Sequence, residues 1–503
     1  MVLKQAAPGV LPPGVETLEK PEGAGAYRWW ALSTTSLGAL LAALNMSTLV
    51  IALPALVRAL HASVLDVVWI LLAYMLAQTA TVLTMGRLGD MWGRKRLYTA
   101  GFALFTVMAL ASGFADSVWL LIVLRVVAGM GGALMIANSG AIVTDAFPRR
   151  ELGLALGING TVVAVGTAVG PVLGGWLTSL SWQWVFWFNV PLGIVGTIWS
   201  ALVLRQTGGG HHQRIDWYGN AIFLVALAGL LIALSMGGIQ GWTQPYVLVG
   251  GLLFVVGTPL FIWLETRVHE PLLDLSLFRN RLFAVANATG FVNGTARMGL
   301  LFLLVFYFQG PRGLDPVHAG LAVTPLALSM LVVSPLAGWV SDRIGSRTPS
   351  TLGLVITAVG LAGMAVAVNG NPPYLLLAVW MSVVGIGGGL FNPPNSSSIM
   401  ASVPVRQRGV ASGVRMLVAF TGSMISIAFV LAIVTSNLPP AVMLRIFSGV
   451  SSGLSTAAVS PFIHGTQAAL IVLAALSLVT APLSLMRGAE ARRHSQRDSP
   501  AAA

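Results

Sequence analysis

The stretch Gly86-Arg87-Leu88-Gly89-Asp90-Met91-Trp92-Gly93-Arg94-Lys95-Arg96 lies between two long apolar runs, residues 66–85 and 97–114. A degenerate second copy, Gly338-Trp339-Val340-Ser341-Asp342-Arg343-Ile344-Gly345-Ser346-Arg347, follows 252 residues later. Glycines allow a sharp turn and a close approach of helices. An Asp followed by several basic residues supplies ion pairs that can form in one conformation and break in another. Two copies half a chain apart indicate two similar halves.

Apolar runs like these recur from end to end of the chain, and its composition explains why. Of 503 residues, 56% are hydrophobic and 9% are charged, whereas a water-soluble protein carries about 25% charged residues. Most of the surface must therefore face lipid. Runs of about 20 residues match the length that a helix needs to cross a hydrocarbon core of about 30 Å. The runs are continuously apolar and do not alternate with period two, so they predict helices and not a closed barrel.

Fourteen spans are predicted, an even number that places both termini on one side of the membrane. They cover residues 30–57, 66–85, 97–114, 117–140, 153–177, 184–204, 217–236, 245–264, 283–308, 318–338, 350–368, 373–399, 409–436 and 465–486. The predicted fold class is an all-α polytopic membrane protein. The tails, residues 1–29 and 487–503, are predicted to be disordered, since neither contains an apolar run.

The basic residues separate by side when every second loop is assigned to one face. The face that carries the two tails holds 22 of the 28 Lys and Arg residues. The opposite face holds Arg58, Arg312 and Arg445, while Arg125, Arg297 and Arg415 fall inside spans. Because cytoplasmic loops are enriched in Lys and Arg, both termini are predicted to be cytoplasmic, in a cell (plasma or inner) membrane. Topology thereby accounts for the net charge of +12, and no nucleic-acid partner is predicted.

Several motifs together resemble the major facilitator superfamily. Residues Gly86 to Arg96 look like its motif A, and Arg125 followed by Gly129 resembles motif B, with Ala128 in place of the usual Gln. The run Gly166-Thr167-Ala168-Val169-Gly170-Pro171-Val172-Leu173-Gly174-Gly175 looks like motif C, which is associated with exporters. Similarity to the 14-helix drug–proton antiporter branch lies in Ala52-Leu53-Pro54, Trp182-Gln183-Trp184, Asn189-Val190-Pro191-Leu192-Gly193, Pro271-Leu272-Leu273 and Leu277-Phe278-Arg279. The resemblance covers residues from about 28 to 486.

This resemblance implies the major facilitator fold, with six-helix bundles at residues 30–204 and 283–486. Residues 205–282 would supply two additional membrane helices and their linkers. The implied mechanism is alternating access, in which two bundles rock about a central cavity that opens first to one side and then to the other. The implied activity is export of hydrophobic or amphiphilic small molecules across the lipid bilayer.

The resemblance also implies roles for the motifs. In motif A, a conformational switch that contains Gly86, Gly89 and Gly93, Asp90 would sit against the start of core helix 11. Arg94 would pair with an acid that ends helix 4, and Asp145 stands in the right place. In motif C, a closely packed contact between core helices 5 and 8 would be formed by Gly166, Gly170, Pro171, Gly174 and Gly175.

One position departs from the family pattern. Drug–proton antiporters commonly carry an Asp in helix 1, nine residues before the Pro of Ala-Leu-Pro, and here that position is Asn45. Asn cannot release a proton, and no Asp or Glu lies near the middle of any predicted span. Coupling through the usual carrier is therefore not expected. Protons stay a candidate coupling ion, since Asp66 or Asp145 could carry them instead.

Three polar residues are predicted near the membrane centre, where substrate sites of such transporters lie. With a rise of about 1.5 Å per residue, Arg125 lies about 12 Å and Asn45 about 16 Å from the outer ends of their helices, and Arg297 lies about 21 Å along its own. Deep charges are costly and are functional candidates. Further cavity candidates are Tyr74, Gln78, Asn138, Asn287, Asn293, Asn392 and Asn395.

These residues predict a cavity that is electropositive or hydrogen-bonding. Such a cavity favours neutral or anionic amphiphiles, including lipids, over lipophilic cations. The alternative for Arg125 is a purely structural role, in which its side chain ties helix 4 to Asn45 and to carbonyl groups of the same bundle. The isolated Asn residues have the analogous alternative of joining helices.

Three interpretations of function stay open. The first is a secondary exporter, the second a lipid or amphiphile transporter or facilitator without proton coupling, and the third a membrane scaffold or sensor. Intact motifs A and C argue against the third. Enzymatic activity, catalytic residues, a metal site and a cofactor are not predicted, because the chain lacks Cys, a nucleotide-binding loop and a nucleophile constellation. A monomer is expected, and residues 437–464 are predicted to form either a lid or hairpin over the outer mouth or a plain flexible loop.

Overall fold

The computed structural model describes residues 24–148, 151–207, 209, 215–268, 271–369, 371–404, 407–436, 438–450 and 455–487. Most of the two predicted tails, residues 1–23 and 488–503, therefore lies outside the described residues. The part of the first tail that is described, residues 24–29, is helical, because the first helix begins at Ala24 and not at residue 30.

The described residues form seventeen α-helices and one 3₁₀ helix, and no strand occurs among them. In chain order they are α1 (Ala24–Ala59), α2 (Val64–Trp92), α3 (Arg94–Ser112), α4 (Val118–Ala146), α5 (Leu152–Leu180), α6 (Trp184–Trp187), α7 (Asn189–Val203), α8 (Trp217–Gln240), α9 (Pro245–Glu265), η1 (Leu275–Arg279), α10 (Arg281–Gln309), α11 (Pro316–Ala322), α12 (Thr324–Ile344), α13 (Arg347–Ala367), α14 (Tyr374–Ala401), α15 (Arg408–Thr435), α16 (Pro440–Phe447) and α17 (Thr456–Leu485). The all-α prediction is confirmed.

Each of the fourteen predicted spans corresponds to a helix or to a pair of consecutive helices. Thirteen spans among the described residues are long and apolar enough to cross a membrane by length and composition. The remaining one, α3, has 19 residues and begins with Arg94-Lys95-Arg96, which lowers its mean hydropathy. It nevertheless packs lengthwise between α4 and α7, so it occupies the position of a spanning helix.

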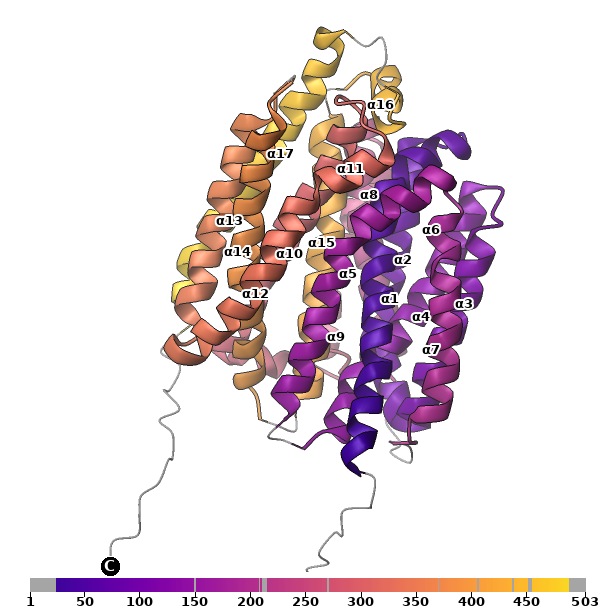
Figure 1. Cartoon of the computed structure of the whole chain (residues 1–503), viewed down its shortest axis with the longest axis vertical. Helices are drawn as coiled ribbons and strands as arrows, with labels where there is room; N and C mark the ends of the chain where they lie inside the picture. Colours follow the sequence, from indigo (N-terminus) through magenta and orange to yellow (C-terminus); the bar gives the residue numbers. More distant parts are fainter. Residues whose placement is uncertain are drawn as a thin grey trace, which may run out of the picture.

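The helices run side by side along one axis, as Figure 1 shows, and α1 begins at the same end of the molecule at which α17 ends. We call this end the terminal face and the opposite end the distal face. In the first half of the chain α1 packs on α5, α2 on α4, and α3 on α4 and α7. In the second half α10 packs on α15, α12 and α17 pack on either side of the α13–α14 pair, and α17 also contacts α10.

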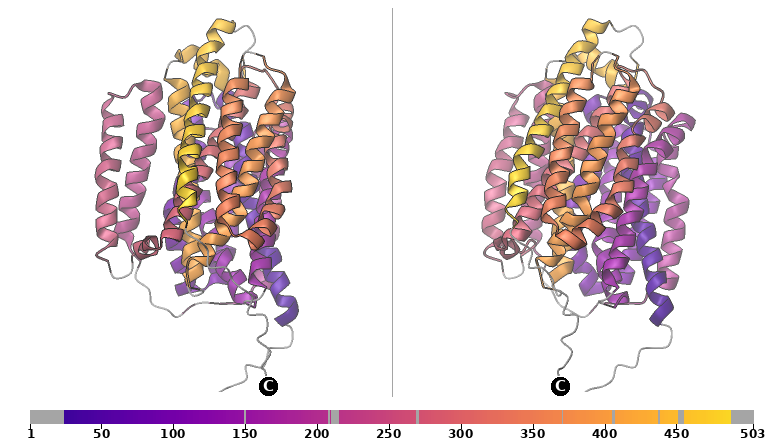
Figure 2. Two further views of the ribbon diagram at one scale, coloured as in Figure 1. Left: turned by 90° about the vertical axis from the view of Figure 1, so that its left-hand side faces the viewer. Right: turned by 60° about the vertical axis from the view of Figure 1, so that its left-hand side comes forward.

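The α8–α9 pair stands at one side of this bundle (Figure 2). The two helices approach closely where Gly229 faces Gly250, because a Cβ on either glycine would lie 2.6 Å from the other's carbonyl oxygen. The α8 helix contacts one helix from each half, α2 and α15. Asn220 Nδ2 donates to Thr84 Oγ1 of α2 at 2.8 Å, and Gly238 lies against the backbone of Ala432 in α15.

The distal segment 437–464 is more helical than the plain loop that was one of the alternatives predicted for it. It holds the short helix α16, and α17 begins at Thr456, nine residues before the predicted start, because Ser455 Oγ accepts the Ala458 N–H. Phe447 at the end of α16 packs its ring 4.4 Å from that of Phe306 in α10. Asn437 and residues 451–454 lie outside the described residues. The segment is therefore largely helical and lies against the distal ends of α1, α2 and α10.

Candidate functional site

The N-terminal half contains a buried cationic cluster built from three helices. The Arg125 side chain of α4 is 1% exposed, and its Nη1 donates to Asn45 Oδ1 of α1 at 3.0 Å. Its guanidinium lies over the Tyr74 ring of α2, 4.1 Å from the ring centre, in a cation–π contact. A second ring, that of Phe186 in α6, lies at 5.8 Å.

This cluster carries unused hydrogen-bond donors. Arg125 Nε and Nη2 and Asn45 Nδ2 are buried, and none has a hydrogen-bond partner among the described residues. Gln78 Nε2 donates to the Tyr74 hydroxyl at 3.3 Å, and Gly132 of α4 leaves room for both side chains. No ion pair joins Arg125 to an acid within the described part of the chain. The arrangement is a buried positive charge that an anionic or hydrogen-bond-accepting ligand can satisfy.

The candidate residues of the C-terminal half do not join this cluster. Asn293 and Arg297 share one face of α10, and among the described residues neither has a hydrogen-bond partner. Asn392 Nδ2 donates to the Gly388 carbonyl of its own helix at 2.9 Å, and Asn287 Nδ2 donates to the Phe283 carbonyl. Asn293 and Arg297 are therefore polar groups of α10 that remain available to a ligand.

Arg487 is placed differently from the sequence prediction, which put it in a disordered tail. It is 4% exposed, beyond the end of α17, and its guanidinium reaches into the terminal end of the C-terminal half. Its hydrogen-bond acceptors are Thr289 Oγ1 and Asn395 Oδ1 at 2.6 Å, Ser350 Oγ at 3.1 Å and Ser398 Oγ at 3.4 Å. Asn395, predicted as a cavity residue, is thus a partner of Arg487.

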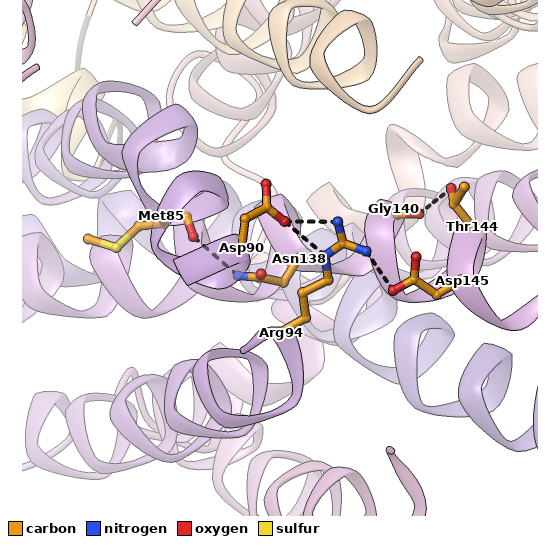
Figure 3. Close-up of polar contacts among 7 residues, drawn as sticks. All are labelled: Met85, Asp90, Arg94, Asn138, Gly140, Thr144 and Asp145. Atoms are coloured by element: carbon orange, nitrogen blue, oxygen red, sulfur yellow. Dashed lines mark hydrogen bonds and ion pairs between the residues drawn. The ribbon is translucent and has the colours of Figure 1, made fainter. Parts of the chain in front are cut away.

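Motif A forms a three-residue ion-pair cluster at the terminal face, drawn in Figure 3. The guanidinium of Arg94 contacts Asp90 Oδ1 at 2.8 Å and Asp145 Oδ2 at 2.5 Å, so it bridges the end of α2 and the end of α4. The pairing with Asp145 is the one that the motif implied. Among the described residues Asp90 bonds to Arg94, and the start of α15 is not among its hydrogen-bond partners.

Gly89 and Asn138 hold motif A against α4. Asn138 Nδ2 donates to the Leu134 carbonyl at 2.8 Å and to the Met85 carbonyl of α2 at 3.4 Å (Figure 3). A Cβ on Gly89 would overlap the Asn138 side chain, so position 89 requires glycine. Asn138, predicted as a cavity residue, lies beneath the motif A loop. Gly93 ends α2 with φ of 99°, a conformation that favours glycine.

The second copy of the motif lies at the same face without an equivalent ion pair. Asp342 makes no salt bridge with any described residue, and the Arg343 guanidinium lies 3.7 Å from the centre of the Trp339 ring. The two halves thus carry related motifs. In the first, Arg94 pairs with two carboxylates, and in the second, Arg343 contacts an aromatic ring.

Replacing Arg94 with Gln is expected to lower the stability of the N-terminal half by about 1 kcal/mol, because two partly exposed ion pairs are lost and two carboxylates are left facing each other. The measurement is the melting temperature in detergent. Arg96→Gln, which removes the same charge from the neighbouring exposed side chain, is the matched control. Equal melting temperatures for the two variants would contradict a stabilising role for the cluster.

Motif C lies on two faces of α5. Gly166, Gly170 and Gly174 lie against Ala43, Ser47 and Thr48 of α1, and added Cβ atoms there would come within 3 Å of α1. Their spacing of four residues puts them on one helix face. Pro171 and Gly175 face the other half instead: a Cβ on Gly175 would overlap the Pro316 carbonyl of α11. Pro171 and Gly175 therefore form a contact between core helices 5 and 8, whereas Gly166, Gly170 and Gly174, which were expected in that contact, pack on α1 because they lie on the other face of α5.

Further contacts close the distal face between the two halves. A Cβ on Gly320 of α11 would overlap the Pro171 carbonyl, so the two helices meet backbone to backbone. Gln309 Nε2 of α10 donates to the Ile51 carbonyl of α1 at 2.9 Å. Arg58 Nη1 of α1 donates to the Ser448 carbonyl next to α16.

The start of α11 is fixed by its N-cap, Asp315, which lies outside the spans. Its Oδ1 accepts the N–H groups of Val317 and His318 at 2.9 and 3.1 Å. Slight burial raises the pKa of Asp315, but the hydrogen bonds from His318 and Val317 outweigh it and hold the pKa below its usual range.

The terminal half of α5 packs on α1 and α4 through Leu152 and Ala155, but parts of its surface are exposed. Leu154 is 57% exposed and Val163 is 41% exposed, and these positions point in opposite directions because nine residues are two and a half turns. Added Cβ atoms on Gly157 and Gly160 would meet nothing within 4 Å.

Three features were missed by reasoning from the sequence. They are the Arg487 network, the bonds of Arg58 and Gln309 across the halves, and two buried acids at the α8–α9 pair, Asp216 and Glu265. The acids had a local signal, since Asp216 directly precedes one predicted span and Glu265 directly follows the next. The other two features join residues far apart in the chain and have no local signal.

Comparisons with known proteins agree with this geometry. The family model described as Major Facilitator Superfamily matches residues 35–215 and 214–427. A riboflavin transporter of Clostridioides difficile (strain 630) is 33% identical over 384 residues, 76% of this chain and 83% of that protein. The multidrug resistance protein Stp of Mycobacterium tuberculosis (strain CDC 1551 / Oshkosh) is 32% identical over 400 residues, which are 79% and 74% of the two chains.

Two more matches complete the comparison. The tetracenomycin C resistance and export protein of Streptomyces glaucescens is 31% identical over 392 residues, 77% of this chain and 72% of that protein. A solved bacterial homologue of the human lysosomal transporter Spinster gives a TM-score of 0.64 at 16% identity, covering 93% of this chain and 97% of its own. That structure supports the fold alone, whereas the family match and the relatives indicate a transporter and not an enzyme.

Proposed function

Because this chain belongs to the drug-exporter branch of the Major Facilitator Superfamily, we propose that it is a secondary transporter that exports hydrophobic or amphiphilic small molecules by alternating access. The two halves that rock against each other would be residues 30–204 and 283–486, with residues 205–282 as the additional pair and its linkers. The chain would act as a monomer in the bilayer.

The observation that carries this proposal is the difference between the two ends of α5. At the distal face α5 and α11 meet backbone to backbone, and at the terminal face the same helix has open space around Gly157 and Gly160. This is the geometry of one end state of a rocking cycle. The excess of Lys and Arg in the loops of the terminal face supports its assignment as cytoplasmic, so this state would be the inward-facing one.

The Arg125 cluster favours a second candidate function, transport of a lipid or another amphiphile without proton coupling. In this cluster a buried cation bonds to Asn45, at the position where the family commonly carries an acid, and no acid among the described residues forms an ion pair with it. A neutral or anionic group of a substrate could accept hydrogen bonds from Arg125 Nε and Nη2 and from Asn45 Nδ2. The names of the relatives, which include a riboflavin transporter and a tetracenomycin C exporter, fit small organic substrates.

The two functions differ in proton movement, which proteoliposomes measure directly. The wild-type protein is expected to move a fluorescent anionic amphiphile without an imposed pH gradient and without proton flux. In Asn45→Asp the new carboxylate would lie 3.0 Å from Arg125 Nη1, a position in which it can bind and release a proton as the pair forms and breaks. This variant is expected to show proton flux during transport.

The control for proton leakage through the liposome membrane is Gly320→Ala. Its transport is expected to fall because of the contact between α5 and α11, and not because of protons. If the wild type moves substrate only with a pH gradient, the uncoupled function is wrong, and another acid, Asp66 or Asp145 first, must carry the proton. Absence of transport for every amphiphile tested, under either condition, would count against the exporter proposal itself.

A further inference from the structure

Two buried acids lie together at the terminal end of the α8–α9 pair. Asp216 is the N-cap of α8 and is 7% exposed, and Glu265 is the last residue of α9 and is 3% exposed. Arg87, a motif A residue within α2, is a basic residue close enough to act on Glu265. Arg87 Nη2 also donates to the Pro271 carbonyl in the linker that leaves α9.

Each carboxylate uses one oxygen and leaves the other unsatisfied. Asp216 Oδ1 accepts the Gly219 N–H at 2.8 Å, and Glu265 Oε2 accepts the Leu273 N–H at 2.9 Å. The remaining oxygens, Asp216 Oδ2 and Glu265 Oε1, are buried and have no hydrogen-bond partner among the described residues. An unsatisfied buried carboxylate oxygen is costly, and here two occur together.

The two unsatisfied oxygens point at the same place. A Cβ added to Gly219 would overlap Asp216 Oδ2 and would also lie 2.8 Å from Glu265 Oε1, so both oxygens crowd one point above this glycine. Two ionised carboxylates in such a site repel each other, and one guanidinium, that of Arg87, cannot neutralise both. A single proton removes the repulsion and gives one acid an O–H that donates to the other.

We propose that Asp216 and Glu265 form a proton-binding site, in which the two carboxyl groups share one proton at neutral pH and thereby hold the α8–α9 pair against the motif A loop. The proposal concerns a proton, and the described residues contain no group of three or more acidic, His or Cys side chains that could hold a metal. The proton binds to one carboxylate oxygen and leaves to solvent, and no other bond changes. The proposal does not depend on what the protein transports.

Among the described residues, the charged groups that face this site come from three segments. Arg87 comes from α2, Asp216 precedes α8, and Glu265 ends α9. Loss of the proton at high pH leaves two negative charges beside one positive charge. The repulsion then strains the hydrogen bonds from Gly219 and from Leu273, so the linker that Arg87 also contacts is loosened.

The effect on stability follows from proton linkage. In the unfolded chain both carboxyl groups lose their protons above a pH of about 4, whereas the folded pair keeps one proton to higher pH. The folded protein then binds more protons than the unfolded chain, so its stability falls as the pH rises through the range in which the pair deprotonates. Glu265→Gln and Asp216→Asn each replace the shared proton with an amide hydrogen, and Asn keeps the N-cap.

The test is infrared spectroscopy of the purified full-length protein in lipid nanodiscs, following the C=O band of protonated carboxyl groups from pH 5 to pH 9. The wild type is expected to keep such a band at pH 7 and to lose it at higher pH. The band should be missing at pH 7 in Glu265→Gln and in Asp216→Asn, and the melting temperatures of these variants should fall less between pH 6 and pH 9 than that of the wild type.

Asp274→Asn is the matched control, because Asp274 caps the 3₁₀ helix of the same linker through a bond to Ser276 and does not face the pair. It should keep the wild-type band. A wild-type spectrum without a protonated-carboxyl band at pH 7 overturns the proposal, whether or not the variants fold. A band that persists in both amide variants overturns it as well, because the proton then belongs to another group.

Discussion

Gly320→Ala is expected to reduce transport at least about tenfold, because it prevents the distal contact between α5 and α11 from closing. A methyl group at this position would overlap the Pro171 carbonyl, which is backbone and cannot move aside as a flexible side chain would. Overpacking of a tight contact costs about 1–3 kcal/mol, and a cost of 1.4 kcal/mol is a factor of about ten in the population of the closed state. Gly175→Ala, which would overlap the Pro316 carbonyl from the other side, should behave alike.

The expected shift is toward the state that is open at the distal face, and it can be seen without measuring transport. The chain contains no Cys, so Thr178→Cys, near the distal end of α5 and 7% exposed, gives a single site for an impermeant maleimide. Labelling should be faster in the Gly320→Ala background. The matched control is Gly160→Ala on the terminal half of α5, where an added Cβ meets nothing. Wild-type transport and labelling in Gly320→Ala would refute this account of the contact.

Arg125→Gln is expected to reduce transport of an anionic or neutral amphiphile roughly 100-fold. The substitution removes a charge-assisted hydrogen bond to Asn45, worth about 1.5–3 kcal/mol, and a buried cation–π contact with Tyr74, worth about 2 kcal/mol. It also removes the two unused donors that a substrate would meet. Arg125→Lys keeps the charge without the planar fork, so it should retain part of the activity toward anions and less toward neutral compounds.

The structural alternative for Arg125 makes a different prediction for the same variants. If Arg125 only joins α4 to Asn45, Arg125→Gln should lower the melting temperature and leave substrate affinity unchanged in the folded fraction. If Arg125 meets the substrate, affinity should fall by more than stability accounts for. Arg415→Gln, which removes a half-buried arginine near the terminal end of α15, controls for the loss of one positive charge in a span.

The sequence alone predicted the membrane helices well, because length and hydropathy are local properties. It did not predict where they break. The span 184–204 is divided near Phe188 into α6 and α7, and the span 318–338 is divided near Val323 into α11 and α12. Each break lies two or three residues before a proline, Pro191 or Pro325, which lacks an N–H and crowds the carbonyl of the preceding turn. The start of α17 was also placed too late, since Ser455 extends the helix into a stretch whose composition suggested a loop.

For the candidate site, the sequence predicted how deep each residue lies within its own helix, but not which residues of different helices meet. Helix geometry placed Arg125 and Asn45 at a similar depth, and the structure brings them to 3.0 Å. It could not show that Asn138 lies beneath motif A, since that depends on the rotation of α4 against α2. Nor could it place Arg487, which donates hydrogen bonds to side chains of α10, α13 and α14. Contacts between residues that are remote in the chain require the fold.

The position of α8 constrains how the two halves can move. The helix is tied to α2 through the Asn220–Thr84 hydrogen bond near its start, and it lies against α15 at Gly238 near its end. Its 24 residues span about 36 Å, and a helix of fixed hydrogen bonding does not lengthen. It therefore connects the two halves at a fixed length. Any change in their relative tilt must rotate α8 about its contact with α2 or move the Gly238 end of α8 along α15. The tilt of α8 relative to α2 and α15 would therefore change with the relative tilt of the two halves.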